Sequence, residues 1–277
     1  MVLPVAAQLP EPNANGLAMG HVHLNVTDVE AQKKFFMEIF GAQPLKKDAL
    51  SGVKVGGMLI VFTKKAPNGG SEGNVMDHFG FKVKNTEATV NKAKAMGYET
   101  RPIFKGTEGF PNSYIIGPDK VKVEIQEDAS RTEPPAVNHL HYLMTTDPQA
   151  LRGWYLDKMN FDATKRGAYQ TANVAGINLT FGPTKTPTIT GSKGSSLDHV
   201  GFEVKDLEAY CKKLEAAGIK FDVPYRRVPN LGIAIAFLTD PQGVYIELTE
   251  GLYAYSRTCL VPGPLPYGRG SVTKPLR

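Results

Sequence analysis

An internal repeat constrains the fold of this chain of 277 residues more than any other feature of its sequence. Residues 76–98 align without a gap with residues 197–219, at a constant offset of 121, and 11 of the 23 positions are identical. The identical pairs are Asp77/Asp198, His78/His199, Gly80/Gly201, Phe81/Phe202, Val83/Val204, Lys84/Lys205, Glu87/Glu208, Ala88/Ala209, Lys92/Lys213, Ala95/Ala216 and Gly97/Gly218. One structural unit therefore occurs at least twice.

A fainter copy of the same unit precedes each of these segments. Residues 20–26 and 138–144 alternate in the way that is typical of a strand, and a helical pattern follows each of them. Polar N-cap residues and C-terminal stop residues bound the four predicted helices. These residues are Asp28, Asn85, Asp147 and Asp206 at the starts, and Gly41, Gly97, Asn160 and Gly218 at the ends. With three more short strands per unit, the sequence predicts an α+β fold of four βαβββ modules.

Two pairs of modules predict two tandem domains, over residues 17–130 and 136–252. The prolines of residues 130–135 favour an extended linker between them. Residues 253–277 read as a Pro/Gly-rich basic tail, to which we assign no function. We expect each domain to curl around its own concave site.

The charge of the chain argues against a nucleic-acid partner. The formal net charge is +5, but residues 251–277 hold four cations and no acid, and residues 1–19 hold one acid, so the body carries about +2. That is too little for a phosphate-binding stripe. No segment approaches the ~20 apolar residues that span a membrane. The cytoplasm is the expected location, with export after removal of a signal segment left open.

Only two cysteines occur, Cys211 and Cys259, so neither a disulfide framework nor a thiolate zinc site is available. Any metal must bind through histidine and carboxylate side chains. All six histidines lie on the predicted first strands of the modules: His21, His23, His78, His139, His141 and His199. On an alternating strand these side chains face away from the apolar, helix-covered side, where a cavity can form.

Two glutamates show the same alternation on predicted last strands. Glu124 lies between Val123 and Ile125, and Glu247 lies between Ile246 and Leu248. Both carboxylates therefore face the histidines. Two imidazoles and a carboxylate per half form the donor set of an open site for Fe(II), Mn(II), Ni(II) or Zn(II).

These residues resemble the vicinal oxygen chelate superfamily, which includes glyoxalase I, fosfomycin-resistance proteins, methylmalonyl-CoA epimerase and extradiol dioxygenases. The resemblance rests on His21-x6-Asp28, Asp77-His78-x-Gly80-Phe81, Asp198-His199-Val200-Gly201-Phe202 and Asp240-Pro241-x-Gly243-x3-Glu247. It implies two tandem glyoxalase-like domains and metal ligands at two sets of positions. The sets are His21, His78 and Glu124, and His139, His199 and Glu247, with His141 as an alternative to His139.

The sequence departs from the family pattern at two places. The fourth ligand position falls near Val61 and Thr180, which supply no carboxylate or amide, so isomerase chemistry of the glyoxalase type loses a ligand. The catalytic His and Tyr of extradiol dioxygenases are also incomplete, since no histidine follows His199; Phe237 stands at one tyrosine position and Tyr114 at the other.

His23 and His141 lie two residues beyond presumed ligands, on the same face of their strands. Each is a candidate catalytic acid or base, or a residue that fills polar space and orients a ligand. Lys105, Arg226 and Arg227 either receive an anionic substrate or are solvated loop cations.

Two functions fit this sequence. One is a divalent-metal-dependent enzyme, a lyase or isomerase or a dioxygenase, that chelates a small oxygen-rich substrate and stabilises an oxyanion. The other is a non-catalytic small-molecule sequestration protein of the bleomycin-resistance type. Either would act as a monomer or homodimer, without a nucleic-acid or membrane partner.

Overall fold

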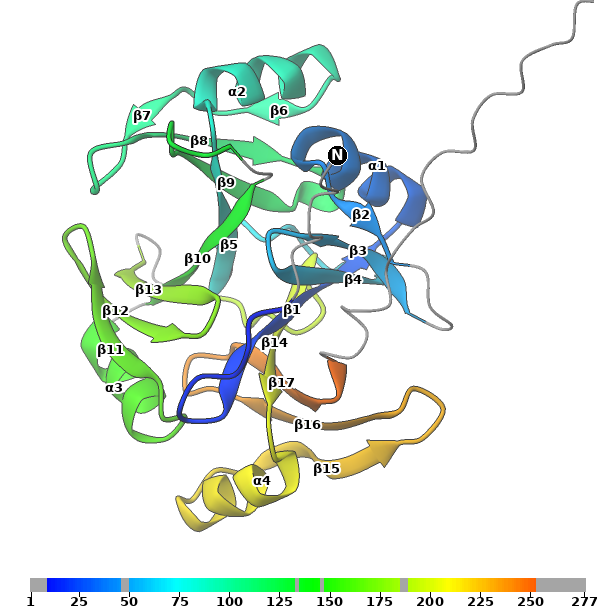
Figure 1. Ribbon diagram of the computed structural model, residues 1–277, viewed down its shortest axis with the longest axis vertical. Coiled ribbons are helices and arrows are strands. Elements are labelled where there is room, and N and C mark those ends of the chain that lie inside the picture. Colours follow the sequence, from blue (N-terminus) through cyan, green and yellow to red (C-terminus); the bar gives the residue numbers. More distant parts are fainter. Residues whose placement is uncertain (1–8, 46–49, 133–134, 145–146, 185–188, 253–277) are drawn as a thin grey trace, which may run out of the picture.

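The computed structural model describes residues 9–45, 50–132, 135–144, 147–184 and 189–252. The predicted basic tail, Cys259 and part of the predicted linker lie outside these ranges. The described residues form the predicted α+β fold of four βαβββ modules (Figure 1). None of the helices in this part of the chain combines the length and the hydropathy that a membrane span requires.

The modules follow one another along the chain. Module 1 comprises β1 (Leu17–Val26), α1 (Val29–Phe40), β2 (Gln43–Pro44), β3 (Ser51–Val55) and β4 (Met58–Lys64). Module 2 comprises β5 (Met76–Val83), α2 (Thr86–Ala95), β6 (Glu99–Thr100), β7 (Phe104–Lys105), β8 (Pro111–Ile116), the short η1 (Pro118–Lys120) and β9 (Lys122–Glu127). Module 3 comprises β10 (Ala136–Met144), α3 (Pro148–Asp157), β11 (Asp162–Arg166), β12 (Tyr169–Val174) and β13 (Ile177–Pro183). Module 4 comprises β14 (Leu197–Val204), α4 (Leu207–Ala216), β15 (Phe221–Val228), β16 (Ile233–Thr239) and β17 (Tyr245–Glu250).

The helix caps form as the sequence predicts. The Asp28 carboxylate accepts hydrogen bonds from the backbone N–H groups of Glu30 and Ala31, at 2.9 and 3.1 Å. Asn85, Asp147 and Asp206 cap the other three helices in the same way. Gly41 adopts a left-handed backbone (φ 65°), which satisfies the last carbonyl groups of α1.

The sheets join modules from different halves of the chain. One sheet has the strand order β15-β16-β17-β14-β1-β4-β3-β2 and unites modules 4 and 1. The other has the order β11-β12-β13-β10-β5-β9-β8-β6, with β7 beside β8, and unites modules 3 and 2. The two junctions are the antiparallel pairs β1–β14 and β10–β5. In Figure 1 the two strands of each pair lie beside each other. The expectation that each half closes on its own concave site was therefore wrong.

The apolar core explains why the sequence still reads as two tandem domains. In the first half, Phe36 and Phe40 of α1 contact Phe79 and Phe81 of β5, with ring centroids 6.2 and 4.9 Å apart. In the second half, the ring centroids of Phe161 and Phe202 lie 5.1 Å apart. Modules within a half thus pack through their apolar faces, whereas modules of different halves are joined edge to edge by the pairing of β1 with β14 and of β10 with β5.

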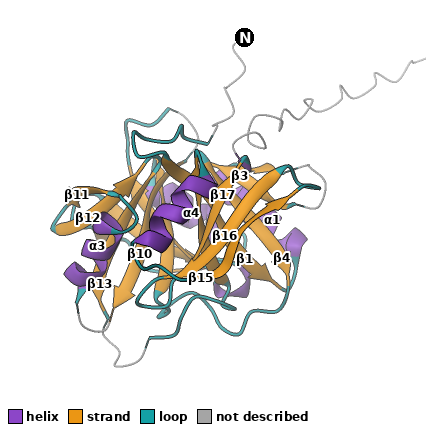
Figure 2. Ribbon diagram, turned by 90° about the horizontal axis from the view of Figure 1, so that it is seen from below, coloured by secondary structure: helices purple, strands orange, loops and turns teal. Residues whose placement is uncertain are grey.

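The helices lie on the apolar side of the strands, with α2, α3 and α4 at the periphery of the molecule (Figures 1 and 2). Val22, Leu24 and Val26 of β1 are fully buried on this side, as their alternation predicts. Tyr155 of α3 is also fully buried, and Trp154 packs against the same core, so both side chains serve packing. The histidines of β1 are left for the opposite face of the sheet.

Candidate metal centres

Two clusters of histidine and glutamate form where the first strands of the modules pair. We call the cluster of His21, His199 and Glu247 site A, and the cluster of His78, His139 and Glu124 site B. In site A, β1 pairs with β14 so that His23 lies opposite His199. In site B, β10 pairs with β5 so that His141 lies opposite His78.

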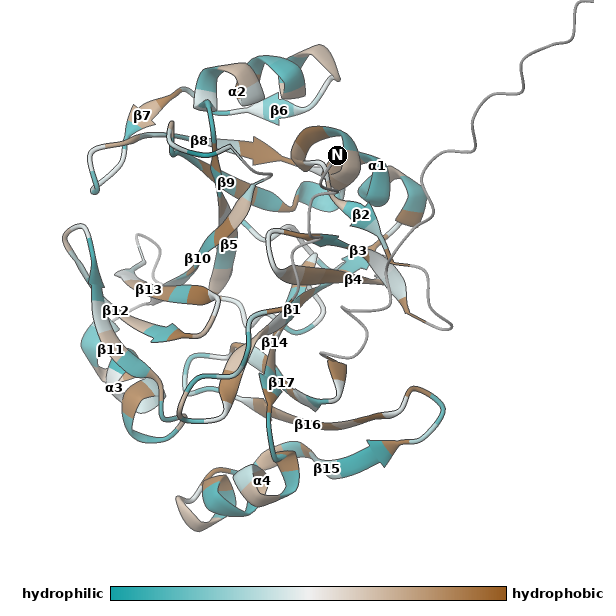
Figure 3. Ribbon diagram, in the orientation of Figure 1, coloured by the Kyte–Doolittle hydropathy of each residue, from teal (hydrophilic) through white to brown (hydrophobic). Residues whose placement is uncertain are grey.

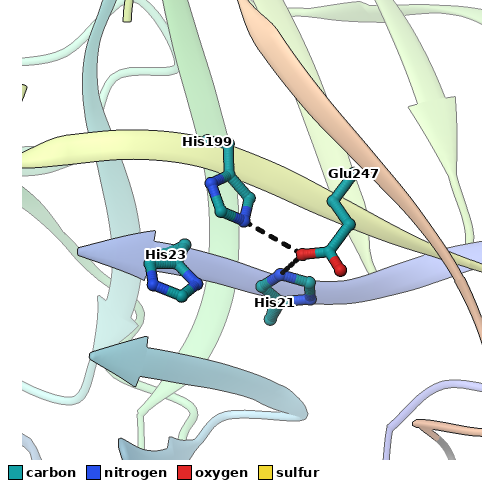
Figure 4. A group of neighbouring side chains, drawn as sticks. All are labelled: His21, His23, His199 and Glu247. Carbon is teal, nitrogen blue, oxygen red and sulfur yellow. Dashed lines mark hydrogen bonds and ion pairs between the residues drawn. The ribbon is translucent and has the colours of Figure 1, made fainter. Parts of the chain in front are cut away.

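Site A gathers both imidazoles at one carboxylate oxygen (Figure 4). His21 Nε2 lies 2.9 Å from Glu247 Oε2, and His199 Nε2 lies 3.0 Å from the same oxygen. His23 stacks on His199 with a ring-centroid separation of 4.4 Å, and its Nε2 lies 2.7 Å from Thr63 Oγ1. One potential ligand atom from each of His21, His23, His199 and Glu247 falls within 4.8 Å of all the others.

Site B repeats this arrangement. His78 Nε2 and His139 Nε2 lie 2.8 and 3.1 Å from Glu124 Oε2, and 3.3 Å from each other. His141 stacks on His78 with a ring-centroid separation of 4.9 Å. Potential ligand atoms of His78, His139 and His141 also lie within 4.8 Å of one another. Both sites therefore contain two imidazoles that contact one glutamate and a third imidazole stacked on one of the two.

The membership of the two sites corrects the grouping that the sequence suggested. His21 joins His199 and Glu247 rather than His78 and Glu124, and His139 joins His78 and Glu124. The reason is the sheet topology, because β1 is hydrogen-bonded to β14 and β10 to β5. Each site thus takes one histidine from one half of the chain and a histidine and a glutamate from the other. His139, and not His141, contacts the glutamate.

An aspartate behind one imidazole of each site fixes its orientation. His199 Nδ1 lies 2.6 Å from Asp198 Oδ1, and His78 Nδ1 is hydrogen-bonded to Asp77 Oδ1. The backbone N–H of Gly194 donates to Asp198 at 2.6 Å, and Lys122 Nζ donates to Asp77 at 3.0 Å, so both carboxylates are held in place. Such a carboxylate keeps the proton on Nδ1 and turns the Nε2 lone pair towards a metal.

A glycine in each repeated motif makes room for the histidine from the other half. A Cβ added to Gly201 would collide with the imidazole of His21, and one added to Gly80 would lie 2.6 Å from His139 Cε1. The sequence showed this signal as the identical pair Gly80/Gly201, two residues after each motif histidine. Its meaning was missed, because only the sheet topology shows which ring lies over each glycine.

Burial and close pairing perturb the ionisation of both sites. Burial would raise the pKa of Glu247, but hydrogen bonds from His199 and His21 hold it well below its usual value. The pKa of Glu124 is lowered in the same way, against burial, by His139 and His78. Burial, reinforced by His199 and His21, lowers the pKa of His23 to about 3.

In site B the pKa of one histidine is raised and the pKa values of the other two are lowered. Burial would lower the pKa of His78, but its bonds to Asp77 and Glu124 raise it. Burial lowers the pKa of His139 to about 4, and burial together with His78 and His139 lowers that of His141 to about 3. His141 is thus neutral near pH 7 and able to bind a metal or accept a proton.

The residues at which the sequence departs from the family pattern lie next to the histidines of the two sites. Val61 is paired with His23 and Thr180 with His141, so the fourth ligand position adjoins the extra histidine in both sites. Phe237 lies beside His199, with ring centroids 5.5 Å apart, and Tyr114 lies beside His78 at 5.2 Å. In each site the fourth ligand position therefore holds no carboxylate or amide, and the histidine next to it is His23 in site A and His141 in site B.

The surroundings of the two sites are opposite in character. Site A opens into a cavity of about 280 Å³ whose walls are mainly aliphatic. In site B, Asn112 Nδ2 donates to Glu124 Oε1, and Glu108 Oε2 lies 3.0 Å from Arg166 Nε and accepts from Gln126 Nε2 at 2.8 Å. Site B is therefore enclosed by a network of hydrogen bonds and ion pairs.

The strand register allows a position-by-position comparison of the walls. Phe237 and Tyr114 each pair with the site glutamate, and Ile235 and Asn112 lie two residues before them. Leu59 and Asn178 are paired with the site histidine of the first strand. In order, the site A and site B residues at matching positions are Val61/Thr180, Leu59/Asn178, Ile235/Asn112, Phe237/Tyr114 and Thr249/Gln126. In most of these pairs an apolar residue in site A corresponds to a polar residue in site B.

Four βαβββ modules place two His/Glu clusters, each able to hold a metal ion, where modules from the two halves pair. A sequence model of the Glyoxalase/Bleomycin resistance protein/Dioxygenase superfamily matches residues 18–125 and 136–248. The chain belongs to this superfamily, as the sequence motifs indicated. The two matched ranges confirm two tandem glyoxalase-like domains in the sequence.

Solved structures show the same fold. Glyoxalase I from Zea mays superimposes with a TM-score of 0.68 at 17% identity, over 87% of this chain and 95% of that one. A putative dioxygenase from Bacillus subtilis superimposes with a TM-score of 0.64 at 14% identity, over 88% and 86% of the respective chains. A search of curated proteins finds no match. At these identities the likeness establishes the fold, and the activity must be argued from the sites.

Proposed function

We propose that the chain is a divalent-metal-dependent enzyme that acts on a small oxygen-rich substrate through two adjacent oxygens. The observation that carries this proposal is the convergence of two imidazole Nε2 atoms, 2.8–3.1 Å from a single glutamate oxygen, in each of two sites. An aspartate sets the ligand-competent tautomer of one histidine in each pair. Repetition of this set in both sites argues against a structural coincidence.

The donor chemistry fits a resident divalent ion. His21, His199 and Glu247 would hold it in site A, and His78, His139 and Glu124 in site B, as the 2-His-1-carboxylate set suited to Fe(II), Mn(II), Ni(II) or Zn(II). When bound, such an ion supplies Lewis-acid polarisation of substrate oxygens. The lowered pKa values of Glu124 and Glu247 keep both carboxylates ionised near neutral pH. Bonds to an aspartate and a glutamate raise the pKa of His78 and of His199, so a cation that binds would displace a proton from these two imidazoles.

His23 and His141 are the proposed proton carriers. Each is neutral near pH 7, because burial lowers its pKa to about 3, and each stacks on a ligand histidine. A neutral imidazole beside the metal ligands is in the form that can accept a proton, and its low pKa would favour passing that proton on to another atom. Thr63 Oγ1 anchors the His23 ring at Nε2, which sets its orientation relative to the site.

Two reaction classes follow from the same donor set. A redox-neutral lyase or isomerase needs the metal as Lewis acid and one residue that moves a proton, which site A supplies in His23. A dioxygenase needs Fe(II) with open coordination positions. The identity of the ion separates them: iron in excess of zinc and nickel, in protein purified without chelators, would favour the dioxygenase.

A metal-free binding protein is the alternative, and the aliphatic cavity beside site A favours it. Metal analysis of the wild type, of His78→Ala and of His199→Ala distinguishes the two functions. The enzyme hypothesis predicts about two ions per wild-type chain and one in each variant. Metal-free protein after reconstitution with each of the four ions would refute the enzyme hypothesis and leave the binding protein.

We also propose that the chain works as a monomer in the cytoplasm on a small molecule, without a nucleic-acid or membrane partner. Both candidate sites are assembled from residues of one chain, because the pairs β1–β14 and β10–β5 bring a histidine of one half beside a histidine and a glutamate of the other. A second copy is not needed to complete either site. Sedimentation of the purified chain at micromolar concentration tests the oligomeric state.

A further inference from the structure

The cavity beside site A has a chemical character that the ligand set does not explain. Val61, Val228, Leu231, Ile233, Ile235 and Leu252 lie along it, beside His21, His199 and Glu247. Several of these residues belong to a hydrophobic cluster of their own, separate from the main core. Figure 3 shows the hydrophobic colouring of β4 and β16, which contribute Val61 and Ile235.

The walls leave few hydrogen-bond partners for a polar ligand. Beyond the candidate ligands and His23, the polar or charged residues that line the cavity are Thr249 and Arg226. Thr249 Oγ1 already donates to the carboxylate of Glu203 at 2.8 Å. Arg226 is exposed and is paired with Ile235 at the outer strand β15. A polar body entering this cavity would lose hydrogen bonds to water without replacing them.

An apolar body is favoured in the same place. Burial of aliphatic or aryl surface against these side chains removes it from water without cost to any polar group. The volume of about 280 Å³ has room for roughly nine groups the size of a water molecule. The polar end of such a molecule would then meet the site A ligands, which form the dense polar cluster among the described residues of the cavity wall.

We propose that site A takes an amphipathic substrate, which carries two adjacent oxygens at one end and a short alkyl or aryl body that fills the cavity. The proposal rests on the metal-binding function proposed above and specifies the substrate class of one of its two sites. Site B differs because Asn112, Thr180 and Gln126 replace Ile235, Val61 and Thr249 at matching positions. Apolar selectivity is therefore a property of site A.

Alkyl hydroxamates are suitable probes, because each chelates a metal through two adjacent oxygens and the alkyl chain can be lengthened stepwise. The zinc-reconstituted full-length chain is titrated by calorimetry with the two-, four-, six- and eight-carbon hydroxamates. In His78→Ala, which retains site A, affinity should rise about three- to fourfold per methylene until the cavity is full. In His199→Ala, which retains site B, the same series should change affinity less than threefold overall.

A second variant keeps the test independent of the ligand substitutions. Ile235→Asn should flatten the chain-length series while zinc stays bound, and Ile235→Leu, which keeps the wall apolar, should preserve it. Arg226→Gln should change the affinity of the uncharged chains less than twofold, since Arg226 lies at the exposed rim. These results would support the apolar wall as the source of selectivity.

The two proposals fail in different ways. Zinc bound in both sites together with a flat series in wild type and His78→Ala would overturn the substrate class and leave the metal function intact. A steep series that survives Ile235→Asn would also overturn it, because the gain would then come from outside the cavity. No zinc in either site would overturn the metal function and the substrate class together.

Discussion

Sites A and B have the same inner set of residues and opposite surroundings. In each site, two histidine Nε2 atoms lie within 3.1 Å of one glutamate oxygen. An aspartate hydrogen-bonds to one of these histidines, and a third histidine stacks on it. Around this set, Ile235 and Val61 of site A correspond to Asn112 and Thr180 of site B. The two sites thus share the residues proposed to hold an ion and differ in the residues proposed to select a ligand.

The anchoring of the extra histidine differs as well. In site A, Thr63 follows Val61 by two residues, and its hydroxyl lies 2.7 Å from His23 Nε2. The matching residue of β13 is Gly182, where an added Cβ would lie 3.0 Å from His141 Nε2. His23 is therefore held by a side-chain hydroxyl at a position where His141 has backbone only. This contrast favours site A as the site where a proton is moved.

The largest expected effect tests the pairing of halves. His21→Ala should weaken binding of the site A ion a hundredfold or more and leave the site B ion in place, since His21 contacts Glu247 and not Glu124. The double variant His21→Ala/His199→Ala should lose the same single ion. Equilibrium dialysis with zinc measures this. Loss of the ion held by His78 in the His21→Ala variant would show that the sites are not grouped as described.

A second prediction concerns the turns before the last strands. Asp240 precedes β17 and accepts from Tyr155 at 2.9 Å, whereas Gly117 precedes β9 and packs against Phe35. Burial raises the pKa of Asp240 from 3.8 to about 6. The folded state therefore binds this proton more tightly than the unfolded state, so its contribution to stability is present below pH 4 and is lost as the pH rises to 6.

Asp240→Asn should remove this pH dependence. Relative to wild type, the free energy of unfolding of the variant should rise by about 2 kcal/mol between pH 4 and pH 7, as a shift of roughly two pKa units implies over this range. Urea unfolding at several pH values measures the difference. Parallel curves for wild type and variant would mean that Asp240 does not titrate in this range. A constant offset from altered hydrogen bonds would not affect the comparison.

The glycines provide a third test. Gly201→Ala places a Cβ against the His21 ring, and Gly80→Ala places one against His139 with a less severe overlap. Overpacking of this kind costs about 1–3 kcal/mol, so both variants should be destabilised, Gly201→Ala more than Gly80→Ala. Each should also weaken the ion of its own site only. Ala at Gly69, where nothing lies within 4 Å, serves as the control and should leave stability and both ions unchanged.

The smallest effect is expected from the residues behind the ligands. Asp198→Asn and Asp77→Asn should each weaken metal binding at one site by about ten- to a hundredfold, because loss of such a partner frees the histidine tautomer and orientation. Dialysis at fixed pH measures both. Equal loss at both sites from either variant would contradict the independence of the two centres.

The sequence predicted the modules well because their signals are local. Alternation placed the histidines and glutamates on the correct face, and Asp28 and Asn85 capped helices as expected. The partners of His21 and His139 could not be predicted, because pairing of β1 with β14 joins strands far apart in the sequence and four similar modules offer several pairings. The contrast between Ile235 and Asn112 likewise gained meaning only from the register.

Anomalous diffraction at the absorption edge of the bound metal tests the central claim most directly. For crystals of the chain grown with Zn(II), the account predicts two peaks, one bonded to His21, His199 and Glu247 and one bonded to His78, His139 and Glu124. Peaks elsewhere, or no peak within bonding distance of these nitrogen and oxygen atoms, would contradict it.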